Sequence, residues 1–479
     1  MKNRRLALAA LLLTVLTAQS AFGQAAWEYS PYRVRVWIAL EAVPQLPAEL
    51  LAPWGEQIQL RSETVLGAVW QVETEPAPPV LREDLLTRLE LLTPERIASV
   101  AKEAVRNDKL YLAAIRIVPG GYEVAVRELD GRTRQAGPVV RRTSAGLDGL
   151  PSALWDALYE SFTPIVRIER VEDQQITARL RAGGLIVDPA SPALIEPGMV
   201  LSPLLRRNDR SGEPTKNGIA TLAWTLLEVK SRTDSLLMCQ VYSGYRSAIP
   251  TRGGVRLERL AMLTRPRFEG TRLVVESRDQ NSRPLAGYDF YSMPAGDAEA
   301  EPELIGSTDS FGSLELLRGD GSIRLLYIKS GRQLLARLPL VPGQAPELTV
   351  KLADDDSRLQ AEGFVVALQG RALDLVARRE ILAARFRARV KERKFADAQK
   401  LLDEFRTLET QQNLRKSLED AQRSVKAADK LTQTRIDKLF ADARGLLNLK
   451  ALRPEMLNEL TGELAAARSG ETAGSPPSG

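Results

Sequence analysis

Apolar and polar residues alternate along the stretch YRVRVWIAL, residues 32–40. One face carries Tyr32, Val34, Val36, Ile38 and Leu40, and the other carries the intervening arginines and a tryptophan. A period of two is typical of a strand with one buried face. Two aromatic residues, Trp27 and Tyr29, precede this strand and could form an exposed ligand platform or pack over the sheet. Packing is the preferred interpretation, because aromatic side chains mostly serve as hydrophobic bulk.

The segment up to residue 163 mixes strand and helix patterns. VLGAVWQVE (65–73) predicts a strand, and residues 80–92, 93–105 and 149–162 predict helices. Thr93 is the expected N-cap of the second helix, with Pro94 at its first position. Two alternating runs in 109–129, joined by a Pro-Gly-Gly turn, indicate a hairpin. We therefore expect residues 27–163 to form an α+β domain, whose element order resembles that of the amino-terminal domain of TolB-like periplasmic proteins.

Residues 164–264 are dominated by strand patterns. The stretches 165–180 and 222–244 each predict a hairpin, and short strands at this spacing are typical of a small barrel or sandwich. Cys239 is the only cysteine of the chain, so no intramolecular disulfide can form. It alternates with apolar neighbours, which predicts a buried and inert thiol, since a reactive one needs exposure and a lowered pKa.

Residues 269–352 contain successive short strands punctuated by Gly, Pro, Asp and Ser. The segments PLAGY (284–288) and TDSFGSL (308–314) resemble a motif of carboxypeptidase-regulatory-like and transthyretin-like β-sandwich modules. Asp309 can cap a tight turn there, and Gly312 can adopt the positive φ that leads into the next strand. The resemblance implies a β-sandwich that serves as an adhesive or spacer module in a secreted protein and carries no catalytic residue.

Residues 358–447 show helical periodicity. Leu368, Leu375 and Leu382 recur every seven residues, residues 395–408 predict a second helix, and residues 414–446 predict one long third helix. The stretch 387–405 resembles the helical hairpin of tetratricopeptide-type repeats. A lone hairpin cannot bury its apolar face, so these helices must pack on one another, on the β-domains or on a second chain. Residues 448–479 predict a short helix and a disordered tail rich in Gly, Pro and Ser.

The amino terminus has the pattern of a secretory signal peptide. A cationic start precedes an apolar run over residues 6–16 and the small residues around Gly23. The run is shorter than the roughly 20 residues that span a bilayer, which disfavours an anchor helix. We expect residues 1–23 to be removed by cleavage near Gly23, and the protein to be periplasmic or extracellular without a transmembrane span.

Composition narrows the chemistry. The 479 residues suggest roughly three or four domains, and 66 Lys and Arg against 61 Asp and Glu give a net charge of +5. The chain has no histidine, which excludes the His-dependent schemes of serine, cysteine and zinc hydrolases. No nucleophile elbow, phosphate-binding loop or CxxC motif is present. The sequence therefore predicts no catalytic residue, cofactor or metal site.

Two charged clusters remain. The triplet Asp354-Asp355-Asp356 could bind Ca²⁺, but its place between a strand and a helix favours helix capping. Residues 360–450 hold 20 Lys and Arg against 13 Asp and Glu. This helix face could meet acidic lipid headgroups, wall polymers or an acidic protein, or could simply be solvated. The candidate interaction surface consists of Arg378, Arg379, Arg385, Arg387, Arg389, Lys391, Arg393 and Lys394.

The predicted fold class is multidomain α+β, with an α+β domain, a β-barrel or sandwich, a transthyretin-like sandwich and a helical hairpin or bundle. The stretches 27–37, 326–343 and 374–390 resemble a family of uncharacterised secreted proteins of planctomycete bacteria. This resemblance implies an envelope location and no known activity. We expect a non-enzymatic envelope scaffold or binding protein that meets a protein partner or a second copy through its helices, and no nucleic acid. The alternatives are a carboxylate-dependent glycan-processing hydrolase or a glycan-binding protein with a site in the first two domains.

Overall fold

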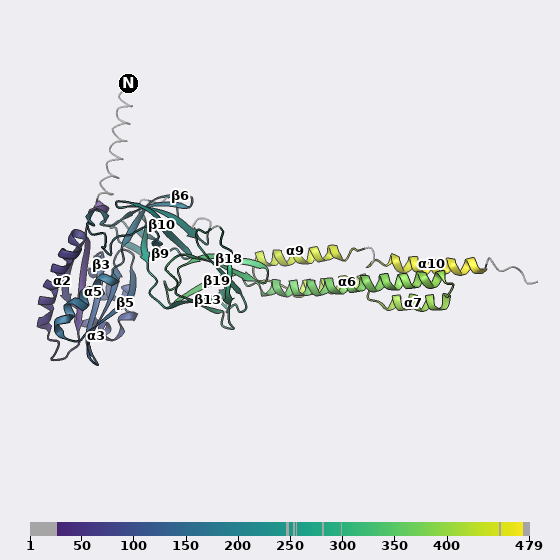
Figure 1. Cartoon of the computed structure of the whole chain (residues 1–479), viewed down its shortest axis with the longest axis horizontal. Coiled ribbons are helices and arrows are strands. Elements are labelled where there is room, and N and C mark those ends of the chain that lie inside the picture. The colour runs from purple at the N-terminus through teal and green to yellow at the C-terminus, as the bar shows by residue number, and fades with distance from the viewer. Residues whose placement is uncertain are drawn as a thin grey trace, which may run out of the picture.

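The computed structural model describes residues 26–472, except residues 246–248, 252, 253, 255, 280, 281, 298, 450 and 451. The predicted signal peptide and the last residues of the predicted tail, 473–479, lie outside the described residues. A head of three β-containing domains is joined to a long helical stalk (Figure 1). The predicted fold class, multidomain α+β with helices at the carboxyl end, is confirmed.

The first domain is a mixed five-stranded sheet in the order β2-β1-β3-β4-β5. The strand β1 runs parallel to β2 and β3, whereas β3, β4 and β5 are antiparallel neighbours. The helix α2 was not predicted, and α4 is shorter than predicted. The elements are β1 (Tyr32–Leu40), α2 (Leu51–Val65), β2 (Trp70–Pro76), α3 (Pro79–Arg88), α4 (Pro94–Val100), β3 (Lys109–Val118), β4 (Gly121–Asp130), β5 (Gln135–Ser144) and α5 (Leu150–Ser161).

The strand β1 buries its Tyr32 face throughout and its second face from Trp37 onward, so the prediction of a single buried face was wrong for the later half of the strand. Helices α2 and α5 pack over the Tyr32 face, and α3 and α4 pack over the Trp37 face. Trp27 is buried in the first of these cores, and its indole Nε1 donates a hydrogen bond to the Arg179 carbonyl at 3.1 Å. Core packing is confirmed for Trp27, and only Tyr29, with 58% of its surface exposed, remains outside.

The second domain is a closed antiparallel barrel of six strands. The order β10-β11-β7-β6-β12-β8 closes on itself through the pairing of β8 with β10, and β9 adds to the free side of β8. Cys239 lies in the barrel core, which confirms the predicted burial, and burial raises the pKa of its thiol to about 12, which disfavours a reactive thiolate. The strands are β6 (Ile165–Glu172), β7 (Gln175–Leu180), β8 (Val200–Asn208), β9 (Pro214–Thr221), β10 (Thr225–Thr233), β11 (Leu236–Ser243) and β12 (Leu257–Thr264).

The third domain is a sandwich of two sheets, β16-β13-β19 and β15-β14-β17-β18, which share one core. The Asp309 carboxylate accepts hydrogen bonds from the amides of Phe311 and Ser313, both at 2.8 Å. Gly312 has φ +70°, as expected for this turn. The strands are β13 (Gly270–Ser277), β14 (Asp289–Pro294), β15 (Glu303–Ser307), β16 (Ser313–Leu317), β17 (Arg324–Ser330), β18 (Gln333–Leu340) and β19 (Glu347–Leu352).

The stalk is built on one helix of 36 residues, which is about 54 Å long. Its first half packs against α8 and α9, and its second half packs against α7 and α10. The predicted single third helix was wrong, because Asp429 accepts a hydrogen bond from the Thr432 amide at 2.9 Å and starts a new helix. The helices are α6 (Asp356–Lys391), α7 (Phe395–Thr407), α8 (Gln411–Ser424), α9 (Lys430–Leu446) and α10 (Glu455–Thr472).

Two further features of the stalk bear on function. The helix α10 has 18 residues and packs its Leu460 and Leu464 into the far half of the stalk, so it is longer than the short helix predicted there. Within the described part of the chain, none of the helices combines the length and the apolar character needed to cross a membrane.

Candidate functional site

The acidic triplet fixes the stalk to the sandwich. Asp355 holds the N-cap position of α6, but its carboxylate accepts hydrogen bonds from Arg358, with Nε at 2.8 Å from Oδ2. The Asp354 carboxylate accepts from the Asp356 amide at 3.0 Å, and both side chains pair with Arg283. Asp355 thus lies at the predicted N-cap position but makes no side-chain capping hydrogen bond, because its carboxylate serves the ion pair with Arg358. Among the described residues, no group of three or more acidic or cysteine side chains could hold a metal ion.

One member of the predicted interaction surface does not belong to it. Arg379 is buried, with 5% of its surface exposed, because it lies on the stripe of α6 that faces the other stalk helices. Its guanidinium donates to the carbonyl oxygens of Leu452 at 2.8 Å and Glu409 at 3.0 Å, and lies 5.4 Å from the centre of the Phe405 ring. Arg379 therefore ties α6 to the connectors that precede α8 and α10 and does not belong to the exposed surface.

The other seven residues of that surface lie outside the stalk core. Arg387 pairs with Glu463 at 3.2 Å, and Glu392 pairs with Arg389 at 2.7 Å and with Lys394 at 3.0 Å. No ion pair is formed within the described residues by Arg378, Arg385, Lys391 and Arg393. The predicted surface is therefore basic, although acidic neighbours on the stalk neutralise part of its charge.

The helix α6 carries a second apolar stripe, which no other part of the described chain covers. The spacing of its residues repeats every 11 positions. Eleven residues fill three helical turns at 3.67 residues per turn, which keeps a stripe nearly straight along a helix. The three large members, Val366, Leu373 and Ile381, are 60%, 63% and 53% exposed. We call this stripe the α6 seam; it consists of Val366, Gly370, Leu373, Ala377, Ile381, Ala384 and Ala388, all exposed.

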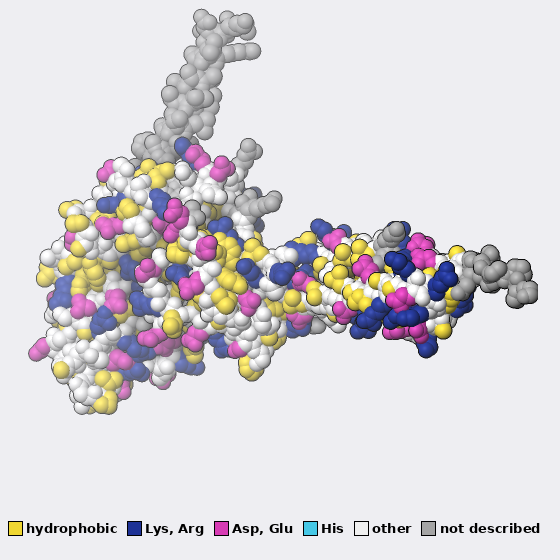
Figure 2. Space-filling model, turned by 45° about the vertical axis from the view of Figure 1, so that its right-hand side comes forward, with side chains coloured by type: hydrophobic (Ala, Val, Ile, Leu, Met, Phe, Trp, Pro, Cys, Tyr) yellow, Lys and Arg dark blue, Asp and Glu magenta, His cyan; other side chains and the backbone are white. Residues whose placement is uncertain are grey.

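The charged residues that flank the α6 seam change from acidic to basic along its length. Asp374 and Glu380 flank the middle of the seam, and Arg385 and Lys391 flank its far end. These four side chains are exposed and form no ion pair with the rest of the described chain. Figure 2 shows hydrophobic side chains on the surface along the middle of the stalk, and charged side chains gathered at its far end.

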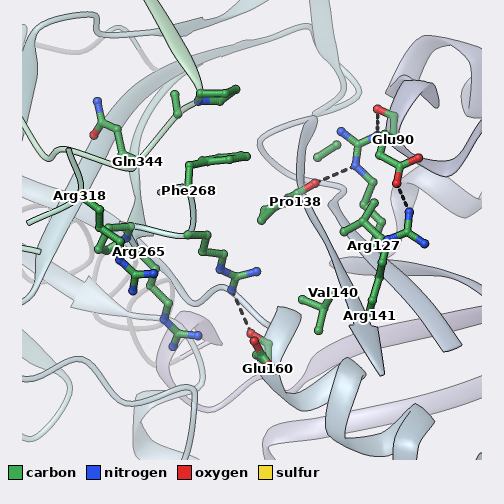
Figure 3. A pocket seen from close by; sticks show the side chains of 17 residues that line it. Glu90, Arg127, Pro138, Val140, Arg141, Glu160, Arg265, Phe268, Arg318 and Gln344 are labelled. Carbon is green, nitrogen blue, oxygen red and sulfur yellow. Dashed lines mark hydrogen bonds and ion pairs between the residues drawn. The ribbon is translucent and has the colours of Figure 1, made fainter. Parts of the chain in front are cut away.

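A cleft of about 1010 Å³ lies where the first domain, the sandwich and the linker between β12 and β13 meet. Sequence reasoning missed it; its one local signal is the run Arg265-Pro266-Arg267-Phe268 in that linker. Figure 3 shows two walls with Phe268 between them. One wall carries Arg265, Arg318 and Gln344, and the other carries Glu90, Arg127 and Arg141.

The two carboxylates of the cleft are engaged by arginines. Glu90 pairs with Arg141, and Glu160 pairs with Arg142. Burial alone would raise the pKa of Glu90, but a backbone hydrogen bond and the Arg141 guanidinium outweigh it and lower that pKa. A glycosidase needs one carboxyl group with a raised pKa and a second one facing it. This pair of carboxylates does not offer that arrangement.

A buried charge cluster lies below the cleft. Lys109 is completely buried, and its Nζ lies 2.6 Å from Glu128 Oε1 and 2.8 Å from Asp130 Oδ2. Burial raises the pKa of Glu128, although Lys109 opposes the shift. The second oxygen of Glu128 accepts the Thr163 amide at 2.7 Å, so both oxygens are occupied. The cluster joins β3 and β4 to the segment that enters the barrel, and it has no free acid or base.

Comparisons with known proteins give little. No protein-family model matches the chain, and no curated protein matches it. Among solved structures, TolB from Acinetobacter baumannii matches at 13% sequence identity over 68% of this chain and 98% of that one. The TM-score of that match is 0.18, so the likeness carries no argument about this protein's fold or function.

Proposed function

We propose that this protein is a non-enzymatic scaffold or binding protein of the cell envelope, which assembles by pairing its stalk with that of a second copy. The α6 seam is the observation that carries the proposal. Single exposed apolar residues are ordinary on protein surfaces. Seven positions in register over residues 366–388 are different, because they form a continuous stripe about 33 Å long. Such a stripe is typical of a helix that pairs with another helix.

The residues of the seam suit a close helix pair. Gly370, Ala377 and Ala384 are small and allow two helix backbones to approach, and the larger Leu373 and Ile381 fill the space between them. The opposite face of α6 is already occupied by the other stalk helices, so the seam is free to meet a partner.

The flanking charges favour an antiparallel second copy. In an antiparallel pair centred near Leu382 of each chain, the segment flanked by Asp374 and Glu380 lies against the segment flanked by Arg385 and Lys391 of the other chain. A parallel pair would place like charges side by side. Antiparallel pairing would hold the two heads at opposite ends of an extended rod, with their β-domains acting as spacers. The signal-peptide pattern of residues 1–23 supports the envelope location.

The mass of the protein in solution tests the pairing. The full chain without residues 1–23 is expected to sediment as a dimer. The double variant Leu373→Glu/Ile381→Glu should be monomeric with an unchanged circular dichroism spectrum, because both side chains are exposed in the single chain. Val187→Glu, on a residue of the head that is 95% exposed, is the matched control and should remain dimeric. A parent chain that stays monomeric at high concentration would overturn the proposal.

Cysteine cross-linking tests the direction. The native Cys239 is buried, so a cysteine introduced on the seam is the reactive one. In the antiparallel pair that the charges favour, Ala377 lies against Ala388 of the other chain. Ala377→Cys should therefore form a disulfide with Ala388→Cys when the two variants are mixed, and neither variant should form one efficiently with its own copy. A disulfide between two copies of Val366→Cys would show a parallel pair.

A further inference from the structure

We infer that the cleft between the first domain and the sandwich binds an anionic sugar, one that carries a carboxylate or phosphate group. This site is separate from the α6 seam, and the inference does not rest on stalk pairing. It rests on the arginines, on two unmatched polar atoms and on the apolar surface of the cleft.

Three arginines of the cleft have no carboxylate partner among the described residues. Arg265 donates only to carbonyl oxygens, the nearer at 3.3 Å, and Arg267 Nη2 donates to the Glu160 carbonyl at 2.9 Å. Arg318 is exposed at the rim. An arginine fork matches the paired oxygens of a carboxylate or phosphate, and such charge-assisted hydrogen bonds are strong.

The guanidinium groups of Arg265 and Arg267 are only partly hydrated. Burial lowers the pKa of both Arg265 and Arg267, and repulsion between the two guanidinium groups lowers that of Arg265 further. The Glu128 carboxylate opposes the shift of both pKa values, but neither guanidinium forms an ion pair with it, and holding cations away from water without a paired counter-ion is unfavourable. An anion bound between them would offset that cost, whereas the carboxylates of Glu90 and Glu160 are engaged by Arg141 and Arg142.

Two buried polar atoms of the cleft lack a hydrogen-bond partner: Arg267 Nη1, a donor, and Gln344 Oε1, an acceptor. Buried polar atoms normally have partners, so a ligand that reached these two atoms after a small shift of the lining side chains would supply a missing hydrogen bond to each. An oxyanion satisfies the arginine donor, and a hydroxyl group satisfies the amide oxygen. A sugar acid or a sugar phosphate carries both groups.

The remaining lining suits a sugar ring. Phe268 lies between the two walls, and Pro138, Pro266 and Pro346 add apolar surface. Small-molecule sites combine apolar lining with a few converging polar groups in this way. The volume of about 1010 Å³ exceeds that of one sugar unit, so the cleft has room for a segment of a longer acidic glycan.

Isothermal titration calorimetry on the full chain with three probes tests the inference: inorganic phosphate, a hexose phosphate and a trisaccharide of hexuronic acid. We expect one or both sugars to bind. Arg318→Gln, at an exposed residue, and Arg267→Gln should each weaken binding about tenfold or more through the lost charge-assisted contact. Arg332→Gln is the control, because it removes the same charge from an exposed turn of the sandwich outside the cleft.

The outcomes separate the parts of the inference. Tighter binding of the uronic acid assigns a carboxylate ligand, and tighter binding of the hexose phosphate assigns a phosphate ligand. Inorganic phosphate that binds as tightly as either sugar would overturn the assignment of a sugar. No binding of any probe at millimolar concentration, or equal binding by Arg318→Gln and the parent chain, would overturn the site. Arg267→Gln loses a hydrogen bond to the Glu160 carbonyl, so Arg318→Gln decides if that variant fails to fold.

Discussion

The Arg358 guanidinium lies 2.7 Å from the Asp355 carboxylate, and both side chains are buried where the stalk leaves the sandwich. The same guanidinium donates to the Ser330 carbonyl at 2.9 Å, at the end of β17. The Asp355 amide donates to the Tyr288 hydroxyl at 3.0 Å, just before β14. The first turn of α6 is therefore tied to two neighbouring strands of one sheet, which sets the direction of the stalk.

Arg358→Met should loosen this junction. It leaves the Asp355 carboxylate buried without its partner, which costs about 3 kcal/mol of unfolding free energy for a broken buried ion pair. Urea unfolding measures the loss, and small-angle X-ray scattering should show a wider range of angles between head and stalk. Arg371→Met, which removes an exposed partner of Glu409, should cost less than about 1 kcal/mol. Equal losses in the two variants would show that the buried pair does not hold the junction.

The core stripe of α6 could be located from the sequence, and the α6 seam could not. Leu368, Leu375 and Leu382 recur every seven residues, and all three are buried in the stalk. The α6 seam has the same kind of periodicity, but four of its seven members are Gly or Ala, which give a weak hydrophobic signal. A stripe of small residues is visible only when the structure shows that its neighbours leave it uncovered.

The errors of sequence reasoning have physical causes. The charge of Arg379 predicts a surface position, yet its long side chain reaches carbonyl oxygens of the connectors before α8 and α10, 30 and 73 residues away. The break before α9 depends on Asp429 capping a new helix, and the apolar pattern continues across it. The cleft assembles residues from Glu90 to Pro346, and no local pattern brings them together.

Trp27→Ala should destabilise the head. The ring fills the first core, and the guanidinium groups of Arg132 and Arg181 each lie 5.1 Å from its centre. Removing a buried tryptophan costs about 3 kcal/mol or more. Tyr29→Ala, on the same arm but mostly exposed, should cost below about 1 kcal/mol by the same denaturant measurement. A stable Trp27→Ala protein would mean that the arm does not pack in solution.

Alkaline pH should unfold the head through Tyr32. Burial raises the pKa of Tyr32 to about 12, against the opposing charge of Lys109, and its ordinary value is near 10. The folded state therefore holds this proton more tightly than the unfolded state. The resulting stability is fully present below pH 10 and is lost as the pH rises through 12.

Urea unfolding at several pH values, with tyrosinate absorbance recorded alongside, measures this effect. Tyr32→Phe keeps the ring and removes the titrating hydroxyl, so its stability should fall less steeply above pH 10. An identical pH dependence in the parent chain and in Tyr32→Phe would contradict the role given to Tyr32. Tyr29→Phe is the matched control, because its hydroxyl is on an exposed residue and its removal should leave the alkaline slope unchanged.

The Cys239 thiol should report opening of the barrel. Burial raises its pKa to about 12, so a thiol reagent at pH 8 should leave the folded protein unmodified. One equivalent should react once urea unfolds the barrel, since Cys239 is the only cysteine. Rapid modification of the native protein would show that the barrel opens locally and that the thiol is accessible. Cys239→Ser should abolish the signal in both states.

Arg378 and Arg379 are adjacent in sequence, but only the substitution of Arg379 should destabilise the stalk. Arg379→Ala removes the donor to the Leu452 and Glu409 carbonyl oxygens inside the stalk. Leaving buried acceptors without a partner costs about 1–3 kcal/mol, so the stalk should unfold at a lower urea concentration. Arg378→Ala removes the same charge from an exposed position and should change stability by less than about 0.5 kcal/mol. Circular dichroism follows both variants, because the stalk holds most of the helix; equal stability would place Arg379 on the surface after all.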